Sequence, residues 1–217
     1  MAVIVIASPK GGAGKSTTAV ILGTELARAG AEVTFIDADP NRSLSLWASK
    51  AKMPPRTNLI NEVGEKTIIK EIRDADGDGK IVVVDLEGVA SRLVSRAISQ
   101  ADLVLTPMKP TTLDATIGVR AIQLVAEEEE VLGREIPHAI VLTATKAVRS
   151  KAHSGIEASL KKQNVDIIQP ELMERSAFAA LFEFGGDLRS MPPQGNQENA
   201  IQNATGFAEA VFKRLMS

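Results

Sequence analysis

The chain contains no cysteine. This absence excludes disulfide bonds, thiolate metal sites, iron–sulfur clusters and cysteine nucleophiles, and a reducing compartment becomes the simplest expectation. Long hydrophobic runs are also absent, since no apolar stretch approaches the roughly 18 residues that a membrane-spanning helix needs. No basic segment precedes the apolar residues 2–7, so a secretory leader is not expected. We therefore predict a cytoplasmic protein.

Neither sign of charge is in large excess, because the formal net charge is only −2 over 217 residues. Binding to nucleic acid would accordingly need a local basic surface and not the charge of the whole molecule. Hydrophobic residues make up 44% and charged residues 24%, as in ordinary globular proteins. A chain of this length can bury one substantial core, so we expect a single domain over residues 1–217.

Short apolar runs alternate with longer segments of helical periodicity. The runs are predicted to be buried strands, and they cover residues 2–7, 33–36, 81–84, 103–105 and 139–142. This alternation favours an α/β fold with a doubly wound, mainly parallel sheet and helices on both faces. In such folds the ligand lies at the carboxyl ends of the strands. Two proline-containing segments, 53–58 and 190–197, are predicted to be loops.

A glycine-rich segment, residues 10–17 with the sequence KGGAGKST, follows the first predicted strand and precedes a predicted helix. Its glycines permit a turn whose backbone N–H groups bind phosphate at a helix N-terminus. Lys15 would reach the β and γ phosphates, and the Ser16 hydroxyl would coordinate Mg²⁺. A turn that only joins strand to helix is the alternative, and the Lys15-Ser16-Thr17 ending argues against it. The segment predicts a P-loop.

Carboxylates follow two other predicted strands. Asp85 ends the apolar run 81–84, where it can hold the Mg²⁺ shell through water, and the N–H of Gly88 can face the γ phosphate. Asp37 and Asp39 follow the run 33–36. Capping of the following turn is the alternative role for these two aspartates. Together these positions predict a site for a nucleotide and a metal.

Residues 10–17 resemble the deviant Walker A signature of the ParA/MinD family of P-loop ATPases, in which Lys10 corresponds to an extra lysine. The resemblance extends to Asp37-Ala38-Asp39-Pro40, Asp85, Thr106-Pro107, Pro110, Asp114 and Arg175-Ser176-Ala177-Phe178. The chain begins at the first strand and so looks like the small ParA type without an N-terminal helix-turn-helix. In that family, prolines often follow the switch II aspartate, which corresponds to Asp85 here. This sequence has Leu86-Glu87-Gly88 instead, which resembles the VirC-type branch of the family.

The resemblance implies ATP and Mg²⁺ as cofactors and assigns roles to residues. Lys10, Lys15 and Asp39 would be catalytic, with Asp39 orienting the attacking water. The metal residues would be Ser16, Asp37 and Asp85. The nucleotide-binding residues would be Lys10, Gly11, Gly12, Ala13, Gly14, Lys15, Ser16, Thr17, Gly88, Pro107 and Lys146.

The resemblance also implies an ATP-dependent homodimer in which Lys10 reaches the partner's ATP. It implies a weak basal ATPase that DNA and a small centromere-binding, ParB-like adaptor stimulate. The resemblance further implies non-specific DNA binding, association with the nucleoid, and partition or positioning of a plasmid or chromosome. It implies no stable membrane association. The residues expected to bind DNA are Lys146, Arg149, Lys151, Lys161, Lys162, Arg189, Lys213 and Arg214. An ordinary solvated surface is the alternative for each of them.

Two other functions remain open at this point. A ParA-like scaffold that positions a protein cargo or recruits a DNA-processing complex would use the same chemistry. A metabolic P-loop kinase or ligase would need an acceptor pocket, for which no second motif is found. His138 and His153 have no expected metal partners, Trp47 is expected in the core, and the amphipathic C-terminal segment is expected to dock as a helix.

Overall fold

Seven strands form one parallel sheet in the computed structural model, which describes residues 2–88 and 91–216 apart from the side chain of residue 117. The strand order is β3-β2-β4-β1-β5-β6-β7, and every described pairing is parallel. The strands are β1 (Ala2–Ile6), β2 (Glu32–Ala38), β3 (Thr57–Ile60), β4 (Lys80–Leu86), β5 (Leu103–Met108), β6 (His138–Thr145) and β7 (Leu172–Met173). The predicted α/β sheet is confirmed.

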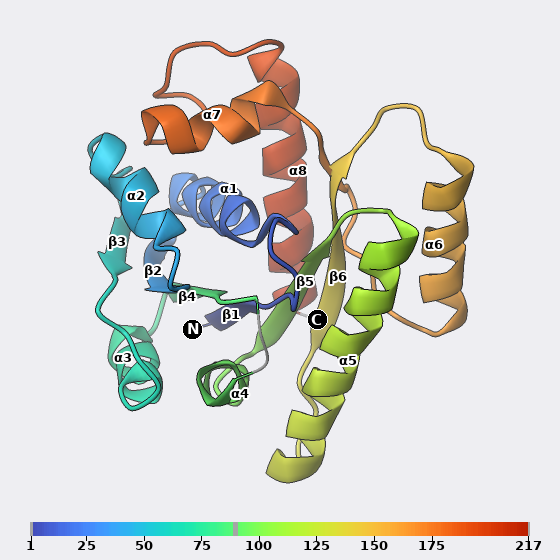
Figure 1. The fold of residues 1–217 in the computed structure, drawn as a ribbon. Helices are drawn as coiled ribbons and strands as arrows, with labels where there is room; N and C mark the ends of the chain where they lie inside the picture. Colours follow the sequence, from blue (N-terminus) through green and yellow to red (C-terminus); the bar gives the residue numbers. More distant parts are fainter. Residues whose placement is uncertain (1, 89–90, 217) are drawn as a thin grey trace.

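Helices cover both faces of this sheet, as Figure 1 shows. One face carries α1 (Lys15–Arg28), α2 (Ser43–Lys50), α7 (Ser176–Phe184) and α8 (Gln197–Leu215). The other carries α3 (Ile68–Ala75), α4 (Arg92–Ile98), α5 (Thr112–Leu132) and α6 (Lys151–Lys162).

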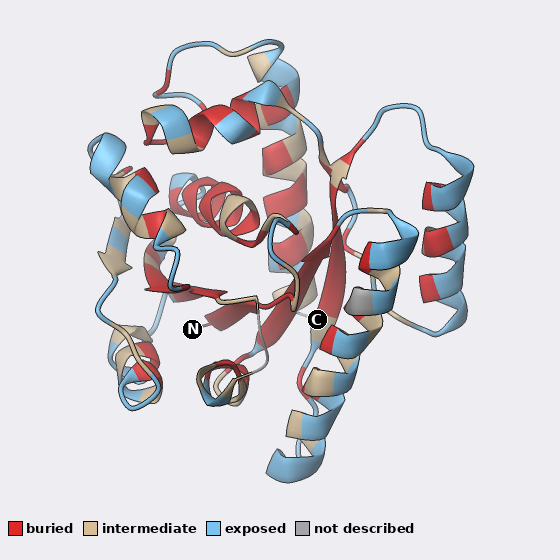
Figure 2. Cartoon of the chain, viewed as in Figure 1, coloured by how far each residue is buried: buried red, intermediate tan, exposed pale blue. Residues whose placement is uncertain are grey.

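Alternate residues of a strand point to opposite faces, and both faces of the central strands are covered. In β1, Ile4 and Ile6 pack in one apolar cluster while Val3 and Val5 pack in the other. Figure 2 shows the consequence, with buried residues along the central strands and α1 and exposed residues along the outer sides of α5 and α6. An uninterrupted apolar run is therefore the signature of a central strand here.

The two edge strands were not predicted from the sequence. β3 begins at Thr57, inside the segment 53–58 that was expected to be a loop, so that expectation is wrong at its end. Among the described strands it pairs only with β2, and its side chains are half-buried or exposed, so its sequence TNLI lacks the apolar run of a central strand. β7 has two residues, too few for any periodicity. The expected loop 190–197 is confirmed up to the start of α8 at Gln197.

Two packing expectations are confirmed. Trp47 is fully buried, donates its indole N–H to the Gly186 carbonyl oxygen at 2.9 Å, and meets the Phe35 ring edge-on with centroids 5.3 Å apart. The C-terminal segment forms α8, which buries Phe207 and Val211 in the same cluster. No helix in the described part of the chain combines the length and the apolar character that a bilayer crossing demands.

Candidate nucleotide-binding site

The glycine-rich loop connects β1 to α1 at the carboxyl edge of the sheet. Gly12 and Gly14 have φ angles of 73° and 94°, in the left-handed region that favours glycine. A Cβ on Gly14 would also lie 3.3 Å from the Thr143 side chain, so β6 approaches the loop closely. The Thr143 hydroxyl donates a hydrogen bond to the Ala13 carbonyl oxygen at 2.8 Å. The loop backbone is thus fixed by its own glycines and by β6.

A cavity of about 320 Å³ lies against this loop. Its lining residues come from distant parts of the sequence and are Gly11, Gly12, Gly14, Lys15, Ser16, Thr17, Asp39, Asn41, Ser43, Gly88 and Phe182. A Cβ on Gly88 would lie 3.3 Å from the Gly11 nitrogen and 3.4 Å from the Lys15 ammonium, so glycine keeps this space open. The fold therefore brings Gly88 to the loop, as the sequence predicts.

Lys15 and Asp39 face each other at the cavity. Lys15 is only 6% exposed, and its ammonium lies 4.0 Å from Asp39 Oδ2. The other Asp39 oxygen accepts hydrogen bonds from the Asn41 backbone N–H at 2.8 Å and its side-chain amide at 2.9 Å. One oxygen of Asp39 thus holds the local turn, and the other is turned toward Lys15. Its catalytic role stays a prediction.

Asp37 and Asp85 lie opposite each other in the register between β2 and β4. Asp37 Oδ2 accepts hydrogen bonds from the Ser45 N–H at 2.8 Å and hydroxyl at 2.6 Å, which anchors α2 to the site. Its Oδ1 is buried without a hydrogen bond from any described residue. This second oxygen is available to a ligand.

Asp85 is completely buried, and neither carboxylate oxygen has a hydrogen bond of normal geometry from a described residue. Burial raises the pKa of Asp85 to about 7, although the nearby Ser16 hydroxyl and the Lys15 charge pull it down. Buried oxygens without partners are costly unless a cation or donor satisfies them. Ser16, Asp37 and Asp85 supply the hard oxygen ligands and water-binding groups that Mg²⁺ prefers, so this donor set fits the metal.

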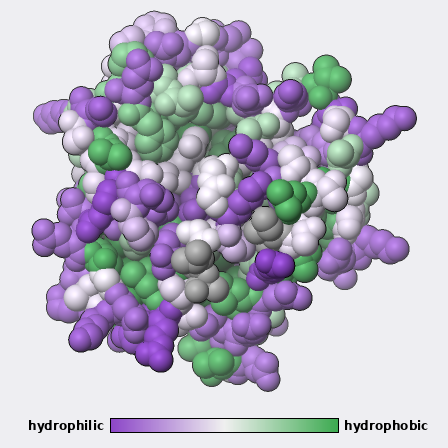
Figure 3. Space-filling view, in the orientation of Figure 1, coloured by the Kyte–Doolittle hydropathy of each residue, from purple (hydrophilic) through white to green (hydrophobic). Residues whose placement is uncertain are grey.

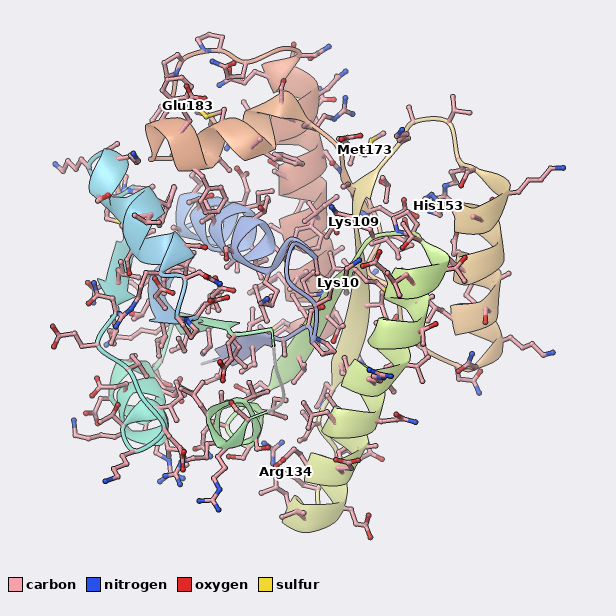
Figure 4. All side chains as sticks on the ribbon, viewed as in Figure 1. Lys10, Lys109, Arg134, His153, Met173 and Glu183 are labelled. Atoms are coloured by element: carbon pink, nitrogen blue, oxygen red, sulfur yellow. The ribbon has the colours of Figure 1, made fainter. Side chains whose placement is uncertain are left out.

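Lys10, the extra lysine, contacts helix α5 and does not line the cavity among the described residues. Its ammonium donates to Asp114 Oδ1 at 2.7 Å, and Asp114 lies in the first turn of α5. Lys10 is not among the described residues that line the cavity, although the adjacent Gly11 is. Figure 4 shows Lys10 close to the start of α5.

A side cavity of about 210 Å³ adjoins the first, and Gly12, Gly14 and Thr17 line both. Its other walls are Thr18, Lys109, Thr143, Ala144, Leu172, Met173, Glu174, Arg175 and Phe178. Sequence reasoning missed Lys109, Met173 and, in the first cavity, Phe182. The position of Lys109 directly after an apolar strand was an available signal, whereas the other two lie in late segments without a motif.

Pro107 and Lys146, both predicted to bind the nucleotide, are not among the described residues that line either cavity. Pro107 is buried within β5, and Lys146 is exposed just after the end of β6. The contacts of Pro107 and Lys146 with the nucleotide therefore stay predictions.

The predicted DNA-binding residues fall into two groups. Four of them are in ion pairs. Arg149 pairs with Glu157 and Glu171, and Lys161 also pairs with Glu157. Arg189 pairs with Glu25, and Arg214 pairs with Asp166. Lys146, Lys151, Lys162 and Lys213 are exposed and make no ion pair with a described residue. Figure 3 shows hydrophilic side chains projecting on the side where α6 lies. The patch is thus less positive than its sequence indicates.

His153 differs from its expected isolation. It is buried, and its Nε2 lies 3.0 Å from Glu171 Oε1, with Glu157 close enough to form a possible three-ligand metal group. Arg149 already binds both carboxylates, at 2.6 Å from Glu157 and 3.0 Å from Glu171. Since cations of the chain neutralise these carboxylates, we interpret the group as a structural tie between α6 and the segment before β7.

Comparison with known proteins gives consistent matches. The family described as VirC1 protein matches residues 1–191. A protein named ParA from Rhizobium radiobacter is 58% identical over 217 residues, covering 99% of this chain and 98% of that protein. The maintenance of carboxysome distribution protein A of Gloeobacter kilaueensis is 28% identical over 165 residues, 72% of this chain and 73% of that protein. An ATP complex of a variant of Cyanothece McdA has a TM-score of 0.78 at 21% identity and covers 98% of this chain and 96% of that one.

Proposed function

This chain belongs to the VirC1 and ParA family of P-loop ATPases, and from that premise we propose that it is an ATP-driven switch for DNA partition or positioning. ATP with Mg²⁺ would bind at the glycine-rich loop, hydrolysis would reset the switch, and a homodimer would be the ATP-bound form. The single observation that carries the nucleotide and metal proposal is the group of buried, unsatisfied oxygens on Asp37 and Asp85 beside the buried Lys15.

Each of the residues at the site has a proposed task. The backbone N–H groups of the loop and the Lys15 ammonium would bind the β and γ phosphates. Ser16, Asp37 and Asp85 would hold Mg²⁺, which when bound supplies positive charge at the phosphates. The base and ribose would extend into the side cavity, where Arg175 provides donors.

Hydrolysis needs a positioned water and stabilised charge more than covalent chemistry. Asp39 Oδ2 faces the cavity and is proposed to orient that water, while Asn41 holds Asp39 through its other oxygen. Lys10 is proposed to complete the site of a second copy, as in the resembled family. Activity would therefore be low in the monomer and higher in the dimer.

DNA binding is proposed to depend on the dimer, because one copy offers only a modest basic surface. Lys146, Lys151 and Lys162 are exposed on and before α6, and a second copy would double their number. A small ParB-like adaptor is proposed to stimulate turnover, and association with the nucleoid in the cytoplasm would follow. The 58% identity to a protein named ParA supports this version of the function.

The proposal is tested by titrating salt in a DNA-binding assay with ATP, ADP and no nucleotide, alongside sizing of the oligomer. We expect binding only with ATP and the dimer, with affinity falling steeply as salt rises. Chelation of Mg²⁺ should abolish turnover. Equal DNA binding in all three nucleotide states would contradict the proposed switch.

A second candidate is an ATPase that positions a protein cargo. It is favoured by the likeness to a relative whose name refers to carboxysome distribution. The chemistry at the site is the same, and the partner distinguishes the two. Stimulation of turnover by a small DNA-binding protein and its DNA site would favour partition, whereas stimulation by a protein assembly without its own DNA site would favour the second candidate.

A further inference from the structure

Lys10 is held within its own chain in this structure. Its ammonium is 2.7 Å from Asp114 Oδ1, and its side chain is 30% exposed. The ion pair joins the glycine-rich loop to the first turn of α5. If Lys10 acts on a nucleotide bound to a second copy, as proposed above, this ion pair must first open.

Asp114 is a charged group that needs a cation. Its side chain is only 3% exposed. Burial by itself would raise the pKa of Asp114, but the hydrogen bonds from Lys10 and Thr111, with the charges of Lys10 and Lys109, hold it below its usual value. The Thr111 hydroxyl donates to Asp114 Oδ2, and the Asp114 N–H donates back to that hydroxyl at 3.1 Å. This reciprocal helix cap fixes the carboxylate and leaves Oδ1 to Lys10.

A second lysine is placed to compensate Asp114. Lys109 is exposed, precedes the cap residue Thr111 by two positions, and makes no ion pair with a described residue. Figure 4 shows Lys10 and Lys109 beside the first turn of α5. The Lys109 charge already acts on the Asp114 carboxyl. Because its side chain is long and exposed, Lys109 can contact Asp114 when Lys10 departs.

We propose that Asp114 is a positioning residue that keeps Lys10 retracted in the monomer, and that Lys109 replaces Lys10 as its counter-ion when Lys10 turns to the nucleotide of a second copy. The exchange avoids leaving a buried carboxylate without a cation, which is the main cost of releasing Lys10. This inference rests on the proposed function. It adds a device that sets how readily ATP binding leads to dimerisation.

Sedimentation velocity at saturating Mg²⁺ and ATPγS measures the dimer dissociation constant of wild type, Asp114→Asn, Lys109→Gln and the double variant. Asp114→Asn keeps the size of the side chain, removes its charge and should tighten the dimer about threefold or more. Lys109→Gln should weaken the dimer by a similar factor, and Lys109→Arg should restore it. In the Asp114→Asn background, Lys109→Gln should have no further effect, since no charge needs replacement. Nucleotide affinity of the monomer is measured separately for each variant.

The outcomes separate the two proposals. A wild type that never dimerises with nucleotide overturns the proposed function and this inference with it. A wild type that dimerises while Asp114→Asn is unchanged or weaker overturns the inference alone, as does an equal effect of Lys109→Gln in both backgrounds. If circular dichroism shows that Asp114→Asn does not fold, Lys109→Gln and Lys109→Arg decide, and equal dimerisation of these two variants overturns the inference.

Discussion

Asp85 is completely buried, and neither of its carboxylate oxygens accepts a hydrogen bond of normal geometry from the described residues. In the unfolded chain its pKa is near 3.8, whereas burial raises it to about 7 in the folded chain. Between these values the folded chain holds a proton that the unfolded chain lacks. The contribution of Asp85 to the free energy of unfolding therefore falls as the pH rises through this window.

We predict that Asp85→Asn reduces the loss of stability between pH 4 and pH 7 in the absence of nucleotide and Mg²⁺. Above pH 7 the variant should be more stable than wild type, by up to about 4 kcal/mol. Urea denaturation at a series of pH values with a chelator measures this. Glu62→Gln, at an exposed position, is the control. The same pH dependence in wild type and Asp85→Asn would contradict the account of this carboxyl.

Asp39 presents one oxygen to Lys15 and uses the other for the turn to Asn41. We predict that Asp39→Ala leaves ATP binding intact and lowers kcat by about 100-fold or more, since the water would lose its orienting group. Asn41→Ala should have a smaller effect, because the Asn41 backbone N–H still holds Asp39. Equilibrium binding and single-turnover hydrolysis measure the two effects. Loss of ATP binding together with turnover would reject the assignment.

At the scale of elements, Arg189 ties the loop between α7 and α8 to α1. Its guanidinium donates to both oxygens of Glu25, at 2.5 and 3.1 Å, and Glu25 is 5% exposed. The Thr205 hydroxyl of α8 also donates to Glu25, at 2.8 Å. Although the sequence suggested a DNA contact, this geometry favours a structural role for Arg189.

We predict that Arg189→Ala lowers the free energy of unfolding by about 1–3 kcal/mol, because a buried carboxylate loses its cation. DNA binding of the ATP-bound form should be unchanged below the unfolding temperature. Lys151→Ala, at an exposed residue without a described ion pair, should show the opposite pattern of intact stability and weaker DNA binding. Thermal unfolding and salt-titrated DNA binding distinguish the two variants. An equal loss of DNA binding in both variants would contradict the structural role of Arg189 and support its predicted contact with DNA.

The same elements show what the sequence can and cannot predict. Central strands can be predicted from their apolar runs because both of their faces are covered. The carboxylates at the ends of these runs lie at one edge of the sheet, because the strands are parallel and their carboxyl ends meet there. Edge strand β3 lacks the run because its side chains remain partly exposed. Ion pairs such as that of Arg189 with Glu25 join residues 164 positions apart, and no local pattern reveals them. Basic residues are therefore easy to count and hard to assign from sequence.

At the scale of the whole molecule, the site is assembled at one edge of the sheet from segments that span much of the chain. Asp39 and Phe182 of α7 line the cavity at the glycine-rich loop, and Asp37 of β2 lies opposite Asp85 of β4. The start of α5 contacts the same loop through Asp114 and Lys10. Lys10 is the residue whose predicted task lies outside its own chain, since it contacts Asp114 and not the cavity. A second copy of the chain is therefore needed to complete the proposed site.

Light scattering of wild type and Lys10→Ala with saturating Mg²⁺ and ATP tests this requirement most directly. Both proteins should bind ATP, because Lys15 and the loop backbone are intact in the variant. Wild type should double its mass with ATP and return to the monomer after hydrolysis, whereas Lys10→Ala should remain monomeric. An ATP-bound dimer of Lys10→Ala would contradict the account.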